Sequence, residues 1–417
     1  MMELLKDKVY IRYWLAVVIS FLGDAMTLTT AVYLVGTLSK DPFMISLVFI
    51  AQLLPLVVIG PLIGPVIDRY SRRMMMVLSD LFRFLIVFFM IFSYENMFLL
   101  ISLIFLQGIG TAVFEPARMA SIPSIVGVNR IPQGIALFQS TLAVIKLVGP
   151  VLGGVILAFQ SPIQIFIFDA FSYFISAILF MGLSVLAKTN EQQFSSELNY
   201  LDHLKTGLFE LFRKPILRFV LILLVPVMVS IGIFTTNYKA VLLQVFEVGK
   251  IEFGLIEGTL AFGTVIGAIA GSYLLKRILH YRLLFLSIGV LGICIVSIHL
   301  ISSLFSQWTL VLFPLIIWSL LIGVSNAILT VPTSTIFLQE MPEIIRGRGT
   351  AIFFSINNLL ILIGTLLGGI LGKNMGIILT IMISGSLLII TVLFYPIFRR
   401  SKLLLRVKDS VSNLLSN

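Results

Sequence analysis

Two apolar stretches of this chain are near copies of each other. Residues 134–154 read GIALFQSTLAVIKLVGPVLGG, and residues 349–369 read GTAIFFSINNLLILIGTLLGG. Both stretches lie inside apolar runs that are long enough to cross a lipid bilayer. The duplication therefore predicts a membrane protein built from two similar halves. At a constant offset, the glycines of the first stretch recur in the second: Gly134, Gly149, Gly153 and Gly154 as Gly349, Gly364, Gly368 and Gly369.

The composition supports an integral membrane protein without a separate soluble domain. Hydrophobic residues make up 59% of the 417 positions, charged residues make up 12%, and the mean hydropathy is +1.10. Soluble domains carry about 25% charged residues. The net charge of +10 is explained by basic cytoplasmic loops, so we expect no nucleic-acid partner. The single cysteine and three dispersed histidines match no metal-ligand spacing, so we expect no metal or other cofactor.

Twelve segments have the length and apolarity of a membrane-spanning helix. If the N-terminus is inside, 23 of the 29 lysines and arginines fall on the inner side, which predicts that both termini are cytoplasmic. We expect a first six-helix bundle at residues 1–187, a cytoplasmic linker with an amphipathic surface helix at 188–215, a second bundle at 216–398 and a cytoplasmic tail at 399–417. The predicted spans are 13–38, 43–67, 74–94, 97–117, 134–159, 163–187, 216–241, 252–275, 283–303, 308–332, 349–372 and 376–398.

Four of these spans, at 43–67, 134–159, 252–275 and 349–372, carry glycines four residues apart. Small residues at that spacing let two helix backbones approach closely in lipid. Because the glycines recur at matching places, we expect these helices to form the sliding interface between the halves; ordinary packing within one half is the alternative. The residues are Gly60, Gly64, Gly149, Pro150, Gly153, Gly154, Gly267, Gly271, Gly364 and Gly368.

Residues 64–73, GPVIDRYSRR, resemble the signature loop of the major facilitator superfamily. That loop has a glycine, an aspartate four residues on, an arginine directly after it and a basic pair; Ser71 departs from the pattern, where the family usually has glycine. Residues 149–154, GPVLGG, resemble the motif associated with antiporters of this superfamily. The patches at 79–83, 114–117 and 346–348 are similar to its macrolide-efflux and drug-antiporter branch. The resemblance covers essentially the whole chain and implies an all-α fold of twelve transmembrane helices in two pseudo-symmetric six-helix bundles.

The same resemblance implies a cytoplasmic gate at the first loop. Asp68 would accept hydrogen bonds from the N-terminus of a helix in the other half, and neighbouring arginines would supply charge-assisted partners. The matching position of the second half holds Leu275, so the gate would be asymmetric. The alternative is that these charges only set the topology. The gate residues are Asp68, Arg69, Arg72, Arg73, Asp80 and Arg83, of which the last two are expected to pair with each other or with the loop.

Ionisable residues inside the predicted spans are candidates for proton coupling, because a charge in the bilayer is costly unless it is paired or functional. Asp24 and Lys146 fall at similar depth, and we expect them to pair, either as a proton switch or as a fixed brace between two helices. Glu115, Asp169 and Glu257 are further candidates, with a structural role favoured for Asp169. Five neutral polar residues are candidates for the substrate cavity: Gln107, Asn237, Asn326, Asn357 and Asn358.

Together these features predict a secondary active transporter that alternates access between its two halves. The specific expectation is a proton-coupled exporter of a hydrophobic or amphiphilic small molecule such as a drug or macrolide, acting as a monomer in the cell membrane with protons and lipid as partners. One alternative is an importer or facilitator of a small solute. A polytopic membrane enzyme is a further alternative, which the dispersed ionisable residues disfavour.

Overall fold

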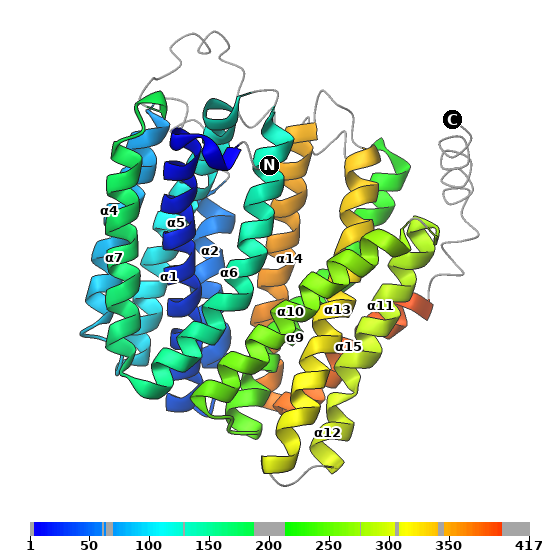
Figure 1. Cartoon of the computed structure of the whole chain (residues 1–417). Helices are drawn as coiled ribbons and strands as arrows, with labels where there is room; N and C mark the ends of the chain where they lie inside the picture. Colours follow the sequence, from blue (N-terminus) through cyan, green and yellow to red (C-terminus); the bar gives the residue numbers. More distant parts are fainter. Residues whose placement is uncertain are drawn as a thin grey trace. The chain divides into compact units, whose positions relative to one another are not determined.

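The computed structural model describes residues 4–60, 62–63, 70–127, 130–186, 213–275, 277–304, 308–340 and 346–393. In these ranges all regular secondary structure is helical (Figure 1). The long helices are α1 (Lys8–Leu38), α2 (Pro42–Ile59), α4 (Arg72–Met90), α5 (Met97–Val126), α6 (Ile131–Phe159), α7 (Pro162–Met181), α9 (Pro215–Ala240), α10 (Lys250–Leu274), α11 (His280–Val296), α13 (Trp308–Glu340), α14 (Arg346–Met375) and α15 (Ile377–Leu393). Shorter pieces are η1 (Leu4–Lys6), η3 (Ser184–Leu186), the π-helical η5 (Val241–Val245) and α12 (Ile298–Leu304).

Each predicted span corresponds to one of these long helices. The ninth span is divided at Ser297 into α11 and α12, and the seventh continues from α9 into η5. In the part of the chain that the structure describes, ten helices are long and apolar enough to cross a membrane. The prediction of an all-α membrane protein with twelve helical spans is confirmed.

Polar residues directly before the apolar runs determine where several helices begin. The Asp7 side chain accepts a hydrogen bond from the Val9 backbone N–H at 2.8 Å at the start of α1. Asp41 caps α2 in the same way, accepting from the Phe43 N–H at 2.9 Å, and a proline follows each of the caps Asp41 and Ser161. Such caps satisfy backbone donors that have no partner within the helix. The helix starts are therefore encoded locally.

The chain forms two compact units. Unit 1 comprises residues 1–197 together with 239–261, and unit 2 comprises residues 198–238 and 262–417. The end of α9, η5 and the first part of α10 thus belong to unit 1, although the sequence predicts them in the second bundle. Contacts within unit 1 explain the difference: Gln244 Nε2 donates to the Ser39 carbonyl at 2.8 Å, and Gly254 lies against Gly154 of α6.

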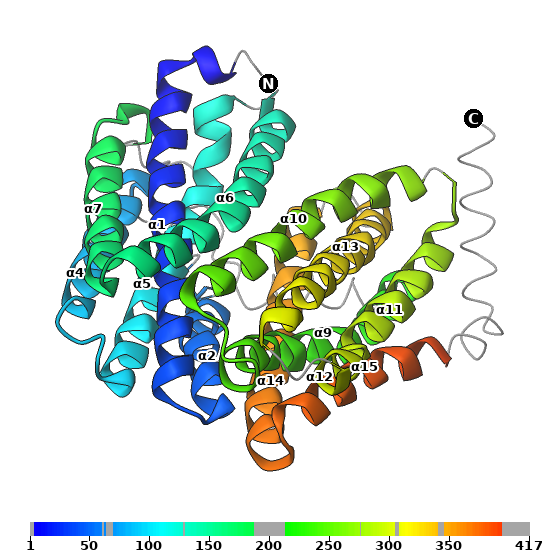
Figure 2. The same ribbon diagram turned by 60° about the horizontal axis from the view of Figure 1, so that its bottom comes forward.

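Unit 1 is organised around α1, which lies between α6 and α7 in both ribbon views (Figures 1 and 2). Helix α4 packs against α5 and α7, and α2 packs against α5. At one end of α1 an aromatic and aliphatic core includes Tyr13, Phe114 and Phe180. The ring centroid of Phe180 lies 5.9 Å from that of Tyr13 and 5.9 Å from that of Phe114. This arrangement brings the middle of α1 against the middles of α4, α5 and α7.

Unit 2 contains a second set of packed helices. Helix α11 packs against α13 and α15, and α14 packs against α15. The glycines of α14 lie directly on the α9 backbone, and Ser230 of α9 donates to the Ser384 carbonyl of α15 at 2.6 Å. A further aromatic group joins α9 to α13, where Tyr238 donates to Ser319 at 3.0 Å and packs against Trp318.

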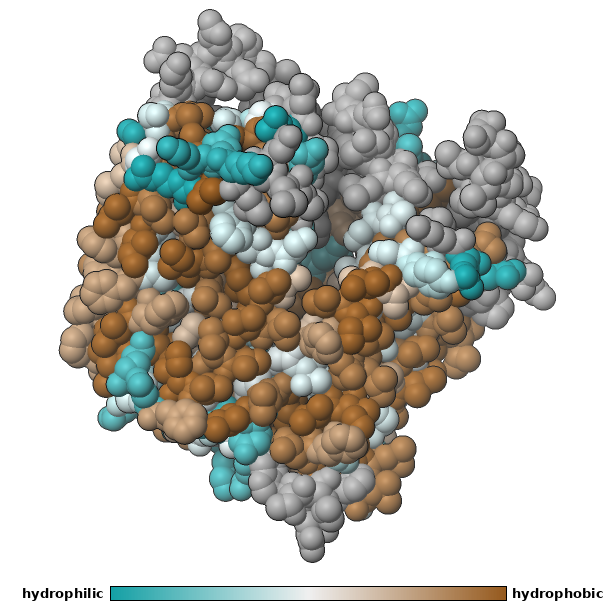
Figure 3. All heavy atoms as spheres, in the orientation of Figure 1, coloured by the Kyte–Doolittle hydropathy of each residue, from teal (hydrophilic) through white to brown (hydrophobic). Residues whose placement is uncertain are grey.

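The outer surface of unit 1 agrees with a membrane environment. In Figure 3 apolar side chains cover the middle of the visible face, and hydrophilic side chains gather near the ends of the helices. Large apolar residues such as Phe92, Phe159 and Phe171 are exposed. A belt of exposed apolar side chains is stable in contact with lipid, which explains why these residues do not turn inward.

Candidate functional site

A charged and polar group of side chains lies inside unit 1, where α1, α4, α5 and α7 meet. We call it the Arg83 cluster; it consists of Asp24, Asp80, Arg83, Gln107, Asp169 and Tyr173. Arg83 is completely buried. It forms an ion pair with Asp80, one turn earlier on α4, and its Nη1 lies 3.6 Å from Asp24 Oδ2 on α1. Its guanidinium also lies over the Tyr173 ring, at 4.4 Å from the centroid.

The apolar surroundings hold the Arg83 guanidinium in place. Its carbon atom lies 4.3 Å from the centroid of the Phe114 ring, so the cation stacks between two aromatic rings. Gly110 of α5 makes room for the arginine stem, because a Cβ at that position would lie 2.6 Å from Arg83 Cγ. Cation–π contacts of this kind are strongest where water is excluded. The arginine is therefore fixed in the core of the unit.

Asp24 is the accessible member of the cluster, with 24% of its side chain exposed. Its Oδ1 accepts a hydrogen bond from Gln107 Nε2 at 2.9 Å and another from the Tyr173 hydroxyl. Gln107 also donates to the Tyr173 hydroxyl at 3.0 Å. These contacts satisfy one oxygen with neutral donors and leave the other facing Arg83. A change in the charge of Asp24 therefore acts on three other helices.

The predicted ion pair between Asp24 and Lys146 is not formed. Asp24 pairs with Arg83 instead, and Lys146 has an exposed side chain on α6. Similar depth in the bilayer did not imply proximity, because a helix can direct two residues of similar depth toward different neighbours. Arg83 and Asp80 pair with each other as predicted, and Arg83 lies about 16 Å along α4 from the first residue of that helix, well inside the span. Their role in a gate stays a prediction.

The remaining gate residues are only partly described. Asp68, Arg69 and Gly64 lie outside the described residues. Arg72 Nη1 donates to Ser124 Oγ of α5 at 3.1 Å, and Arg73 Nη1 donates to the Met181 carbonyl at the end of α7 at 3.3 Å. Both arginines thus link the start of α4 to neighbouring helices of unit 1. Their role in a gate stays a prediction.

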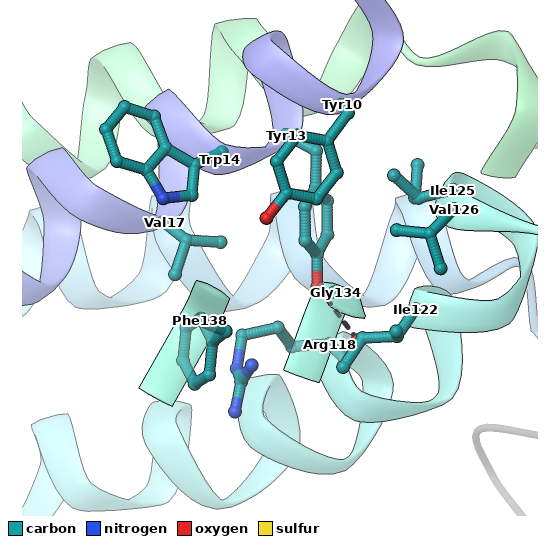
Figure 4. Close-up of a pocket in the computed structure, with 10 residues that line it drawn as sticks. All are labelled: Tyr10, Tyr13, Trp14, Val17, Arg118, Ile122, Ile125, Val126, Gly134 and Phe138. Carbon is teal, nitrogen blue, oxygen red and sulfur yellow. Dashed lines mark hydrogen bonds between the residues drawn. The ribbon is translucent and has the colours of Figure 1, made fainter. Parts of the chain in front are cut away.

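Glu115 forms an ion pair that the sequence analysis did not identify. Both Nε and Nη2 of Arg118 donate to Glu115 Oε2, at 3.0 and 2.6 Å. The Arg118 guanidinium lies 3.9 Å from the centroid of the Phe138 ring and borders a small enclosed pocket (Figure 4). The Tyr13 hydroxyl donates to the Arg118 carbonyl at 3.0 Å. The spacing of three residues on one helix was the available signal for this pair.

Glu257 pairs with Lys239, and both side chains are largely buried within unit 1. The pair joins the end of α9 to α10 on either side of the π-helical η5. Lys239 lies on the last turn of α9. A buried lysine beside a buried glutamate explains how two charges are accommodated in an apolar region.

Most of the predicted interface glycines pack within their own unit. An added Cβ at Gly153 would meet the Met26 backbone of α1 at 3.4 Å, and Gly149 also faces α1. Gly267 and Gly271 face α13, Gly364 and Gly368 face α9, and Gly60 ends α2 near its own Leu56. In this structure these glycines therefore serve packing within one half, since close approach serves any pair of neighbouring helices; their role in a sliding interface stays a prediction.

Gly154 differs from the other glycines of α6. An added Cβ there would lie 2.7 Å from the Lys250 carbonyl and 2.8 Å from the Gly254 Cα of α10. Conversely, a Cβ at Gly254 would lie 2.8 Å from the Pro150 carbonyl. Two helix backbones are in direct contact here. Gly154 and Pro150 thus contact α10, one of the helices expected at the sliding interface.

The predicted cavity residues fall into different environments. Gln107 belongs to the Arg83 cluster, whereas Asn237 is fully buried and donates to the Ile233 carbonyl and to the Gly368 carbonyl, each at 2.9 Å. Asn357 is buried, and Asn326 and Asn358 are half-buried. Asn237 therefore has a structural role between α9 and α14. Among the residues that the structure describes, no group of three potential ligands could hold a metal ion.

Apolar helices in two units, with ion pairs buried inside unit 1, are consistent with a membrane transporter. The match to a family model places the chain among transporters of the major facilitator superfamily. The chain belongs to the transmembrane secretion effector family of this superfamily, whose family model matches residues 2–412. The resemblance to the macrolide-efflux branch is confirmed by the relatives below. These proteins are membrane transporters and not enzymes.

Three relatives align over most of their length. The uncharacterized MFS-type transporter YfiS of Bacillus subtilis (strain 168) is 27% identical over 89% of this chain and 88% of its own. Macrolide efflux protein A of Streptococcus pyogenes is 21% identical, and the staphyloferrin A transporter of Staphylococcus aureus (strain NCTC 8325 / PS 47) is 25% identical, each over 92% of this chain and 94% of the relative. The crystal structure of the nucleoside transporter NupG shares the fold, with a TM-score of 0.76, 13% identity, and coverage of 95% of this chain and 100% of that chain.

Proposed function

We propose that this transporter is a proton-coupled exporter of a hydrophobic or amphiphilic small molecule. The observation that carries the proposal is the contact of the partly exposed Asp24 with the fully buried Arg83 inside spanning helices. Ionisable residues at such positions are costly, and they are typical of proton pathways in membrane proteins. When a carboxylate that faces a fixed guanidinium binds a proton, the electrostatic attraction between the two groups is lost. When the carboxyl group releases the proton, the attraction returns.

The geometry supports a mechanism in which protonation of Asp24 loosens unit 1. When Asp24 is ionised, it holds α1 to α4 through Arg83 and to α5 and α7 through Gln107 and Tyr173. When Asp24 is neutral, the attraction to Arg83 is lost while the neutral donors remain. The two protonation states thus favour different packing of α1, and a transporter can use such a difference to bias its two access states.

The direction of transport and the substrate class are supported by sequence. Two relatives are named for macrolide efflux and for staphyloferrin A, which are different substrates. The chain also carries the GPVLGG sequence at residues 149–154 that resembles the antiporter motif. We therefore propose export and define the substrate only by its class. The distribution of basic residues supports both termini in the cytoplasm, and we further propose that the transporter acts as a monomer in the cell membrane.

A screen in an efflux-deficient bacterial strain tests this function. The strain would express the chain, the Asp24→Asn variant or an empty vector. Each culture would be exposed to macrolides, amphiphilic cations and siderophores. We expect raised resistance and lower accumulation of one class only with the native chain, and we expect a protonophore to remove the effect. Higher accumulation with the native chain would instead identify an importer, and an effect that survives the protonophore would exclude proton coupling.

A further inference from the structure

The charges of the Arg83 cluster do not balance. The cluster holds three carboxyl groups and a single guanidinium: Asp24 and Asp80 contact Arg83, and Asp169 of α7 lies against Gly23, the residue before Asp24. If all were ionised, the cluster would carry two net negative charges in the interior of a membrane protein. Uncompensated buried charge is strongly unfavourable in a low-dielectric region. A neutral cluster therefore requires two bound protons.

Asp80 is the carboxyl group best suited to stay ionised. It is completely buried and forms its ion pair with Arg83 within the same helix, at a spacing of three residues. This geometry is set by α4 alone and does not depend on how the other helices pack. The two protons then belong to Asp24 and Asp169.

Asp169 lies deep in the unit and lacks a full set of hydrogen bonds. It is completely buried, and its Oδ1 accepts a hydrogen bond from Ser172 Oγ at 3.3 Å. Its Oδ2 is buried without a hydrogen-bond partner among the described residues, and so is the neighbouring Thr27 hydroxyl of α1. The Thr27 hydroxyl can pair with Oδ2 in either protonation state, because a hydroxyl both donates and accepts. An ionised Asp169, however, would have no ion-pair partner among the described residues, which favours the neutral form.

Gly23 brings Asp169 next to Asp24. An added Cβ at Gly23 would lie 2.7 Å from Ser172 Oγ and 3.0 Å from Asp169 Cα, so only glycine permits α1 to approach α7 this closely. Among the described residues, the charged and titratable groups that interact with Asp169 are Asp24 on α1, Arg83 on α4 and Tyr173 on its own helix. The two carboxyl groups therefore influence each other's protonation, as interacting sites do.

We infer that Asp169 is a second, exchangeable proton-binding group of this transporter, so that the Arg83 cluster holds two protons in its neutral state. Asp24, which is partly exposed, exchanges its proton first, and the buried Asp169 exchanges second. This inference extends the proposed proton coupling to a second site. It assigns exchange to a residue of α7 that the sequence favoured as structural.

Infrared spectroscopy of the purified, full-length protein in lipid nanodiscs tests the inference without a substrate. Protonated carboxyl groups absorb in a spectral region separate from that of carboxylates. At neutral pH we expect two protonated-carboxyl bands, of which Asp24→Asn removes one and Asp169→Asn removes the other. Asp7→Asn is the control, because Asp7 is an exposed helix cap outside the cluster, and we expect it to leave both bands unchanged. On raising the pH, both bands should disappear, that of Asp24 first.

Several outcomes would overturn the inference. An unchanged spectrum in Asp169→Asn would show that Asp169 carries no proton, and a band that persists at every pH would show a permanently protonated structural residue. Loss of the bands on replacing choline chloride by sodium chloride would identify a sodium site instead. If Asp169→Asn does not fold, Ser172→Ala removes the hydrogen bond to Asp169 and must shift its band. Because these bands are independent of efflux, a failed compound screen would leave the result standing.

Discussion

Asp24 Oδ2 on α1 lies 3.6 Å from Arg83 Nη1 on α4, and this contact joins two helices at the centre of unit 1. The arginine cannot follow a movement of α1, because it is paired with Asp80 and stacked against Phe114 and Tyr173. A change at Asp24 is therefore converted into a change in helix packing. The first prediction follows from this relationship.

Asp24→Asn keeps the shape of the side chain and removes the proton-binding group. We expect this variant to lose uptake of substrate into inverted vesicles that are energised only by a pH difference. The remaining uptake should equal that of vesicles that lack the transporter. Exchange of labelled for unlabelled substrate should persist, because exchange needs no net proton movement. Undiminished pH-driven uptake by Asp24→Asn would remove Asp24 from the coupling mechanism.

Lys146→Met is the matched comparison for Asp24→Asn. Lys146 does not pair with Asp24 in the structure, so its removal leaves the contacts of Asp24 with Arg83, Gln107 and Tyr173 in place. We expect pH-driven uptake within about twofold of the native rate, since a substitution away from such contacts changes energies by about 0.5 kcal/mol. Loss of coupling in Lys146→Met would show that the pair forms in another state of the cycle.

The helical spans could be predicted from the sequence, whereas most side-chain partners could not. Apolar runs and caps such as Asp41 are local signals, so the twelve helical segments were identified from them. Pairs three residues apart, such as Asp80 and Arg83, were also accessible because one helix fixes their geometry. The contact between Asp24 and Arg83 joins two different helices, so it depends on how each helix is rotated about its axis. In a nearly uniform apolar sequence the periodicity of hydrophobic residues does not define that rotation.

Tyr173 and the glycine faces illustrate the same limit. A tyrosine in an apolar span is compatible with a lipid-facing position, and only the packing of α7 on α1 reveals that its hydroxyl donates to Asp24. Glycines four apart predict close helix contact correctly but do not specify the partner. Gly153 contacts α1, whereas the adjacent Gly154 contacts α10, because neighbouring residues of a helix point in different directions.

Gly154→Ala tests the direct contact of α6 with α10. The new methyl group would lie 2.7 to 2.8 Å from backbone atoms of Lys250 and Gly254, which cannot rotate away. We expect a loss of stability of about 1–3 kcal/mol, as for overpacking in a protein core. Gly289→Ala is the control, because its nearest neighbour outside its own helix is Val392 at 3.7 Å. Thermal unfolding in detergent, followed by size-exclusion chromatography, compares the two; equal stability would contradict the contact.

Asp68→Asn tests the gate that the family resemblance implies. The substitution keeps the shape and removes the charge that would bind a helix N-terminus. We expect transport to fall to background while the amount of protein in the membrane, measured by immunoblot, is unchanged. Arg72 and Arg73 contact neighbouring helices of unit 1, so substituting either one with Gln should reduce both transport and stability. Normal efflux by Asp68→Asn at normal expression would exclude the gate.

Lys239→Met tests the buried ion pair that spans η5. This variant leaves the Glu257 carboxylate without its cation in a largely buried position, and removing one partner of such a pair costs about 3–5 kcal/mol. Glu257→Gln should also be destabilising, because it removes the carboxylate from the largely buried ammonium group of Lys239. The double variant Lys239→Met/Glu257→Gln contains neither buried charge, so we expect it to regain most of the lost stability. Thermal unfolding of the native chain and the three variants completes a double-mutant cycle, and strictly additive losses would show that the two side chains do not interact.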